Sequence, residues 1–309
     1  MTIGAEGQCT GGRIGKMSFT PPNEQARRAA IGSLDDISTE ARVLFNPASF
    51  QPITAPGPMD WLAVQAERGQ SFQQWIQAGA NIPRPPRNRI YFQPIGEFPK
   101  EAPKLETLKN WAEAFFSLPT SMLPAKSAES LKVYSRNKGE PNKTQLLTTD
   151  VLSRLKAQIP RDAFCLLAIT FEDLYPDPKW NFVFGQASLQ ERVGVYSFVR
   201  FDPAFYGQKD ANREQTILRR SCRILAHETG HMFGIQHCIY FRCVMNGSND
   251  IEEADAQPLH LCPVDLHKLH ASVRFDVVER YAHLQDFCRS HGLTEEANWI
   301  GAQLKSVRS

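Results

Sequence analysis

The predicted architecture depends on one segment of this 309-residue chain, His227-Glu228-Thr229-Gly230-His231-Met232-Phe233-Gly234-Ile235-Gln236-His237. Its first five residues form the pattern His-Glu-x-x-His within a predicted central helix over residues 216–233. Apolar residues recur there at three- and four-residue steps, which is the pattern of one packed helical face. Residues four apart lie on the same side of a helix, so His227 and His231 can bind one metal ion.

A third histidine follows after a glycine. Gly234 can end the helix at a positive φ and turn the chain back, so that His237 reaches the same ion. Three nitrogen ligands leave one position of a tetrahedral zinc ion open, which is typical of a catalytic site, and Glu228 would lie beside that position as the general base. The alternative is that these are ordinary polar residues on a partly solvent-exposed helix. The glycine and the third histidine in register favour catalytic zinc.

A second set of potential ligands follows directly. Cys238 and Cys243 come after the third histidine, and Cys262-Pro263 follows farther along the chain. Two close thiols and a distant Cys-Pro turn are typical of the two halves of a structural zinc site, although free cysteines are often simply small buried residues. Met245 is placed where a metzincin has the Met-turn methionine beneath its zinc ion. Gly247 stands where some metzincins have a tyrosine ligand, so no such ligand is expected here.

The composition is that of an ordinary globular protein, with 42% apolar and 22% charged residues. The formal net charge is +2, from 35 basic and 33 acidic side chains, which argues against nucleic-acid or membrane-surface binding. The N-terminus has no apolar core typical of a secretory signal, so we expect a cytoplasmic protein, present also in the nucleus, that is not secreted. Seven cysteines without such a signal favour reduced thiols or metal ligands over disulfides.

A cluster of prolines divides the chain. Pro83, Pro85 and Pro86 form a stiff break and place a domain boundary near Asn88. Residues 1–87 are predicted to be a partly disordered N-terminal extension, with short helical runs at 23–31 and 71–77. Residues 88–309 are predicted to form one α/β domain. Strands are expected in it at 89–93, 164–170, 181–187 and 193–201, and further helices at 105–116, 149–156 with Thr149 as N-cap, 276–288 and 294–305.

The combined histidine and cysteine motif resembles that of the archaemetzincins, and in particular of the type-2 branch found in vertebrates. The resemblance covers residues 88–285. It implies a metzincin-like α/β (α+β) zincin fold, with a mixed twisted sheet, a central zinc-binding helix and C-terminal closing helices. It also implies catalytic zinc on the three histidines and a second, structural zinc ion on four cysteines. The implied activity is that of a peptidase, for which aminopeptidase-like cleavage of small peptides is the usual suggestion.

Asp265 departs from this resemblance, because the family has its fourth cysteine at that position. A carboxylate carries the same charge and binds zinc, but it is a harder and usually weaker partner in a thiolate-rich site. We expect Asp265 to be the fourth ligand of the second zinc ion, and Asp265→Cys to raise zinc affinity and thermal stability. His260, His267 and His270 lie nearby and are alternative donors, although a solvated histidine is the simpler interpretation of each.

The sequence therefore predicts a zinc metallopeptidase that acts on a peptide or protein substrate, which would pair with the strand at 181–187 or 193–201. One alternative is a catalytically weak zinc protein that binds peptides or partner proteins, but such a site does not need Glu228. A second alternative is a nucleic-acid-binding zinc module, which would need basic residues near the cysteines. That region is acidic instead, because it contains Glu252, Glu253 and Asp255. The oligomeric state and the physiological substrate are not predicted.

Overall fold

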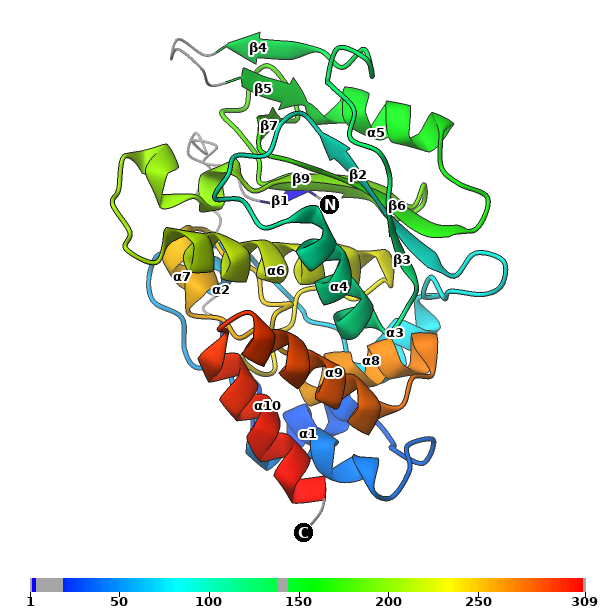
Figure 1. Ribbon diagram of the computed structural model, residues 1–309. Coiled ribbons are helices and arrows are strands. Elements are labelled where there is room, and N and C mark those ends of the chain that lie inside the picture. Colours follow the sequence, from blue (N-terminus) through cyan, green and yellow to red (C-terminus); the bar gives the residue numbers. More distant parts are fainter. Residues whose placement is uncertain (1, 4–18, 138–143, 308–309) are drawn as a thin grey trace. The chain divides into compact units, whose positions relative to one another are not determined.

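The computed structural model describes residues 2–3, 19–137 and 144–307 (Figure 1). The contacts among these residues divide the chain into two compact units. The first unit contains Pro83–Glu113 and Leu118–Met232, together with the strand at Thr2–Ile3. The second contains residues 19–82, Ala114–Ser117 and the chain from Phe233 onward. The disorder expected over residues 1–20 falls mostly on residues 1 and 4–18, which lie outside the described residues, whereas Thr2 and Ile3 form a strand.

The first unit is built around a mixed six-stranded sheet with the order β1-β8-β9-β6-β2-β3. The strands are β1 (Thr2–Ile3), β2 (Arg89–Ile95), β3 (Thr120–Met122), β6 (Ala163–Thr170), β8 (Gly185–Ser188) and β9 (Val193–Ser197). β3, β2, β6 and β9 pair in parallel, whereas β8 is antiparallel to β9 and to β1. Every residue of β6 is buried, as expected for a continuous apolar run at the centre of a sheet. The predicted α/β class and mixed sheet are confirmed.

Two predicted strands are shorter than expected. The strand expected at 181–187 is confined to β8, because Val183 bridges to β7 (Asp173–Tyr175) instead. The strand expected at 193–201 ends with β9 and continues as the 3-10 helix η3 (Val199–Phe201). β8 lies between β1 and β9, and β9 lies between β8 and β6. Both edges of each strand are therefore paired, and the expectation that a substrate pairs with one of these two strands is wrong.

One face of the six-stranded sheet packs on α5 (Thr148–Ala157) and on a smaller sheet of β4 (Ser135–Asn137), β5 (Thr144–Leu147) and β7. Val151 and Leu155 of α5 belong to the same buried cluster as Leu166 of β6 and Val195 of β9. The predicted N-cap of α5 is wrong: Leu147 holds that position in place of Thr149, because the chain passes directly from β5 into the helix.

The opposite face of the sheet carries α4 (Leu105–Phe116) and α6 (Arg213–Met232), as Figure 1 shows. Trp111 of α4 donates through Nε1 to the carbonyl of Cys222 in α6 at 2.8 Å, which ties the two helices together. Gly194 of β9 leaves room for a side chain of the neighbouring strand, because a Cβ there would lie 2.8 Å from Leu167 of β6. The predicted central helix is confirmed, and the short η4 (Pro203–Tyr206) lies between η3 and α6 along the chain.

Among its described residues, the regular elements of the second unit are all helices. Its elements are α1 (Glu24–Ile31), η1 (Ala41–Phe45), η2 (Pro47–Ser49), α2 (Trp61–Val64), α3 (Phe72–Gln77), α7 (Ile251–Asp255), α8 (Pro263–Val273), α9 (Val277–Ser290) and α10 (Thr294–Val307). α9 and α10 confirm the two predicted closing helices. α8 was not predicted, because Cys262-Pro263 was interpreted as a turn, whereas proline is also favoured at the first position of a helix.

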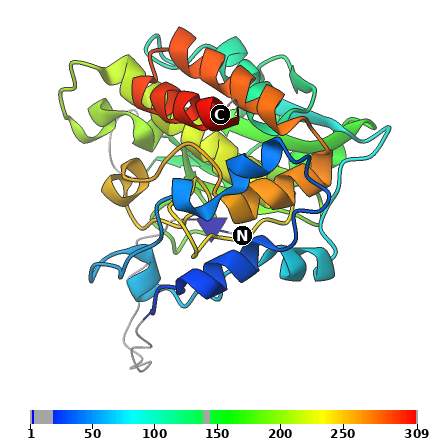
Figure 2. The same cartoon turned by 90° about the horizontal axis from the view of Figure 1, so that it is seen from below.

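Residues 19–82 pack on helices from the other end of the chain. α1 and α3 contact α8, and η1 contacts α10; Figure 2 shows the blue N-terminal segments beside the orange α8. His267 of α8 stacks on Phe72 at 3.5 Å between ring centroids, and its Nδ1 lies 2.7 Å from the carbonyl oxygen of Ile31. The predicted division between residues 1–87 and 88–309 stays a prediction. Among the described residues, no helix is long and apolar enough to cross a membrane.

Candidate metal centre

The last turns of α6 present two of the predicted ligands together. His227 and His231 are buried, and their Nε2 atoms lie 3.1 Å apart. Two ligand nitrogens at about 2.0–2.1 Å from a tetrahedral zinc ion would themselves be about 3.3 Å apart, so the spacing fits a shared ion. α6 ends at Met232 and Gly234 has a φ of 75°, which confirms the predicted glycine turn.

His237 completes the predicted set. The candidate ligand atoms of His227, His231 and His237 all lie within 4.8 Å of one another, and all three residues are buried. Buried imidazole nitrogens that face one another have few hydrogen-bonding solutions, since a neutral ring has one donor and one acceptor. A divalent cation accepts a lone pair from each ring, so the residues present fit a bound zinc ion.

Glu228 is also buried, at 3% exposure, and its Oε1 has no hydrogen-bond partner within the described structure. Burial raises the pKa of the Glu228 carboxyl to about 8. A carboxylate in such a position is costly unless a cation or a proton compensates it, and a neighbouring cation would favour the ionised form. A strongly perturbed carboxyl next to metal ligands is a typical feature of a catalytic site.

The predicted cysteine cluster also comes together. Cys238 Sγ lies 3.5 Å from Cys262 Sγ, and the ligand atoms of Cys238, Cys243, Cys262 and Asp265 all lie within 4.8 Å of one another. Sulfurs about 2.3 Å from a tetrahedral zinc ion would be about 3.8 Å apart, so this cluster also fits a metal. The backbone N–H of Cys262 donates to Cys243 Sγ at 3.2 Å, and burial raises the pKa of both thiols. The six described cysteines form no disulfide.

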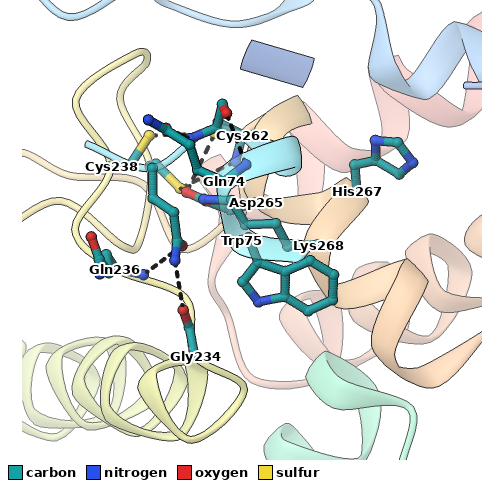
Figure 3. A network of polar contacts seen from close by, with 12 residues as sticks. Gln74, Trp75, Gly234, Gln236, Cys238, Cys262, Asp265, His267 and Lys268 are labelled. Carbon is teal, nitrogen blue, oxygen red and sulfur yellow. Dashed lines mark hydrogen bonds and ion pairs between the residues drawn. The ribbon is translucent and has the colours of Figure 1, made fainter. Parts of the chain in front are cut away.

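Asp265 is fully buried and directs one oxygen at the thiols, as Figure 3 shows together with Cys238, Cys262 and Lys268. Its Oδ2 lies 3.4 Å from Cys243 Sγ and 3.5 Å from Cys262 Sγ. Its Oδ1 accepts from Lys268 Nζ at 2.8 Å, and that lysine is only 1% exposed. Burial raises the pKa of Asp265 to about 7, against the lowering effect of Lys268. The carboxylate therefore connects the thiols to a buried ammonium group.

The three alternative donors lie in other environments. His260 stacks on Trp299 with ring centroids 3.5 Å apart, and the Nε2 of His267 lies 3.2 Å from Asp36. The ring of His270 packs edge-on against Phe275. None of them joins the cysteine cluster among the described residues, so the expectation that they substitute for Asp265 is not supported. His267 and His270 are buried rather than solvated, and His260 is half-buried.

Met245 is fully buried, and its carbonyl oxygen accepts from the backbone N–H of Cys238 at 2.9 Å. This bond closes the loop between the last histidine and the methionine. Two further residues that contact the candidate ligands were missed by sequence reasoning. Lys268 had a local signal, since it lies three residues after Asp265 on one helix. Glu67 had none: it lies 2.8 Å from His237 but 170 residues away in sequence.

Comparison with known proteins gives a consistent set of relatives. Residues 111–271 match the family model of peptidase family M54. The chain is 37% identical over 268 residues to archaemetzincin-2 of Homo sapiens, covering 77% of this chain and 74% of that protein. It is 32% identical over 254 residues to archaemetzincin-1 of Homo sapiens, covering 73% of this chain and 51% of that protein. A crystal structure of archaemetzincin from Archaeoglobus fulgidus complexed with malonate aligns with a TM-score of 0.45 and 28% identity, covering 58% of this chain and 99% of that one.

Proposed function

The chain belongs to the archaemetzincin family of zinc metallopeptidases, and from this premise we propose that His227, His231 and His237 hold its catalytic zinc ion. Glu228 is the proposed general base. The observation that carries this proposal is the convergence of the three buried histidines, with their ligand atoms within 4.8 Å of one another, beside a buried carboxyl group. A structural site has no use for that carboxyl group, because it needs only its ligands.

The proposed reaction is hydrolysis of a peptide bond. When bound, zinc supplies Lewis acidity toward a carbonyl oxygen and a water molecule. Glu228 accepts a proton from the attacking water while the water oxygen forms its bond to the carbonyl carbon. The same carboxyl group then gives that proton to the amine nitrogen as the C–N bond breaks, so one water is consumed and an acid and an amine are released.

For the second cluster we propose a structural zinc ion held by Cys238, Cys243, Cys262 and Asp265. The burial of all four residues and the short distances between their ligand atoms support this assignment. The cluster links the loop after α6 to the start of α8. A metal there would add folding free energy, because the unfolded chain has no preformed site.

The proposed substrates are small peptides cleaved in an aminopeptidase-like manner, which the family resemblance implies. The competing proposal is a catalytically weak zinc protein that binds peptides or partner proteins. The buried Glu228 favours the enzyme, because such a carboxyl group is costly to keep where it has no chemical role. The cytoplasmic and nuclear location stays a prediction.

A pair of matched peptides tests both parts of this proposal. The zinc-loaded protein is incubated with one small peptide that has a free amino terminus and with the same peptide acetylated there. We expect the free peptide alone to be cleaved, and Glu228→Gln to cleave neither. Equal cleavage of both peptides by the wild type would replace the aminopeptidase assignment by an endopeptidase. No cleavage of either, with zinc bound at the histidines, would support the binding-module alternative.

A further inference from the structure

His237 differs from the other two candidate ligands in how it is held. His227 and His231 belong to α6 and keep their spacing through the helix itself, whereas His237 lies five residues beyond the helix end, in a loop. A ligand on a loop has to be fixed by contacts from elsewhere. We propose that residues 61–75, called here the clasp, hold His237 in place and that Glu67 is its positioning residue. This inference rests on the proposed zinc-binding role of His237.

The clasp binds the backbone on both sides of the glycine turn. Trp75 donates through Nε1 to the carbonyl of Phe233 at 2.9 Å. The amide group of Gln70 donates to the carbonyl of Gly234 at 3.2 Å and accepts from the N–H of Gln236 at 3.2 Å. Figure 3 shows Gly234 and Gln236, the two residues that Gln70 contacts, together with the indole of Trp75. The turn that leads to His237 is thus held at three backbone groups, which are the carbonyls of Phe233 and Gly234 and the N–H of Gln236.

Glu67 acts on the histidine ring itself. His237 Nδ1 lies 2.8 Å from Glu67 Oε1, and since a carboxylate only accepts, Nδ1 carries the proton. In a neutral ring the lone pair then lies on Nε2, the nitrogen left for the metal. A carboxylate behind a metal-binding histidine fixes its tautomer and orientation and raises its basicity. Glu67 has the position and the chemistry for that role.

Trp61 holds Glu67 and the ring in their relative positions. Its Nε1 donates to Glu67 Oε1 at 2.9 Å, and its ring meets that of His237 edge to face at 5.3 Å between centroids. The indole also fills the space over Gly247, where a Cβ would lie 2.4 Å from Trp61 Nε1. Gly247 is therefore needed for the clasp to lie where it does. The clasp lies outside the 111–271 region that the family model matches.

Metal binding to purified full-length protein tests this inference. Co²⁺ is titrated into the metal-free wild type, Glu67→Ala, Glu67→Gln and the control Glu40→Gln, which changes an exposed carboxyl group of the same N-terminal region. Co²⁺ on thiolates gives a sulfur-to-metal charge-transfer band that Co²⁺ on histidines lacks, so the two sites are followed separately. His231→Ala identifies the signal of the histidine site.

We expect Glu67→Ala to weaken Co²⁺ binding at the histidine site by about 10–100-fold, as loss of such a partner usually does. Glu67→Gln keeps an oxygen acceptor without its charge and should show a smaller loss, with an altered ligand-field spectrum. Glu40→Gln should match the wild type, and none of the three should change Co²⁺ binding at the thiolates. Wild-type affinity and spectrum in Glu67→Gln and Glu67→Ala would overturn the role of Glu67. If Glu67→Ala does not fold, Glu67→Gln decides alone. Absence of any His231-dependent Co²⁺ signal in the wild type would instead overturn the proposed zinc site.

Discussion

Replacing Asp265 by cysteine tests the departure of this chain from an all-cysteine second site. Asp265 and Lys268 are 0% and 1% exposed, and Lys268 Nζ lies 2.8 Å from Asp265 Oδ1. The substitution removes the anion that compensates a buried ammonium group, and removing one partner of a buried ion pair costs about 3–5 kcal/mol. We therefore expect Asp265→Cys to lower the free energy of unfolding of the metal-free protein by about that amount. The expectation from the sequence, that Asp265→Cys raises zinc affinity and thermal stability, concerns the zinc-bound protein and stays a prediction.

The double variant Asp265→Cys with Lys268→Met should recover most of this loss. It removes both charges and leaves an apolar side chain of similar length, and such replacements of buried pairs are often neutral or stabilising. With four thiolates it should also hold zinc more tightly than the wild type against a chelator. Asp265→Cys and Lys268→Met should each lower the free energy of unfolding of the metal-free protein. The sum of these two decreases should exceed the decrease in the double variant by roughly 3 kcal/mol or more.

Urea denaturation in the presence of a chelator and a thiol reductant measures these free energies. Lys305→Met provides the control, because it removes an exposed lysine and should change stability by less than about 0.5 kcal/mol. The reasoning is refuted if Asp265→Cys alone is as stable as the wild type without metal. It is equally refuted if the effects of the two substitutions add without coupling.

Three further predictions concern the proposed catalytic site and the acid stability of the fold. His231→Ala should lose the catalytic zinc ion and peptidase activity together, which metal analysis and a peptide assay of the same sample check. Glu228→Gln should keep zinc and lose about 10²–10⁴-fold in turnover, since it removes a general base but no ligand; loss of metal as well would contradict that role. Burial raises the pKa of Asp202, but hydrogen bonds from Arg213 and a backbone N–H outweigh it and hold the value below 3.8. This contribution to stability is present above pH 3.8 and lost as the pH falls through the lower folded value, so Asp202→Asn should lower stability at pH 7 and flatten its decline in acid.

The parts of the structure that the sequence predicted are those with a local physical signal. α6 was predicted because its apolar spacing extends over several turns, and Gly234 because a chain that must turn back there needs a positive φ. β6 was predicted because an uninterrupted apolar run is typical of a central parallel strand. The spacing of His227 and His231 followed directly from helical geometry.

The parts that the sequence did not predict depend on contacts between distant residues. Cys262-Pro263 was interpreted as a turn, but Asp265 lies in the first turn of α8, and its burial with Lys268 follows from tertiary packing. No local pattern connects Glu67 to His237, because residues 170 apart meet only once the chain has folded. Residues 181–184 were predicted to belong to a strand, yet Val183 forms an isolated bridge with Leu174 of β7. Which strand such a segment pairs with depends on the neighbouring strands that the fold brings close to it, and the periodicity of the sequence alone does not show this.

The central claim is that His227, His231 and His237 bind one zinc ion beside Glu228. The most direct measurement is the anomalous scattering of a crystal of the zinc-loaded protein at the zinc absorption edge. We expect a peak with one nitrogen from each of the three rings at about 2.0–2.1 Å, and with Glu228 close by but outside the ligand set. A fully occupied peak at the cysteine cluster with none at the histidines, or a histidine peak that lacks His237, would contradict the account.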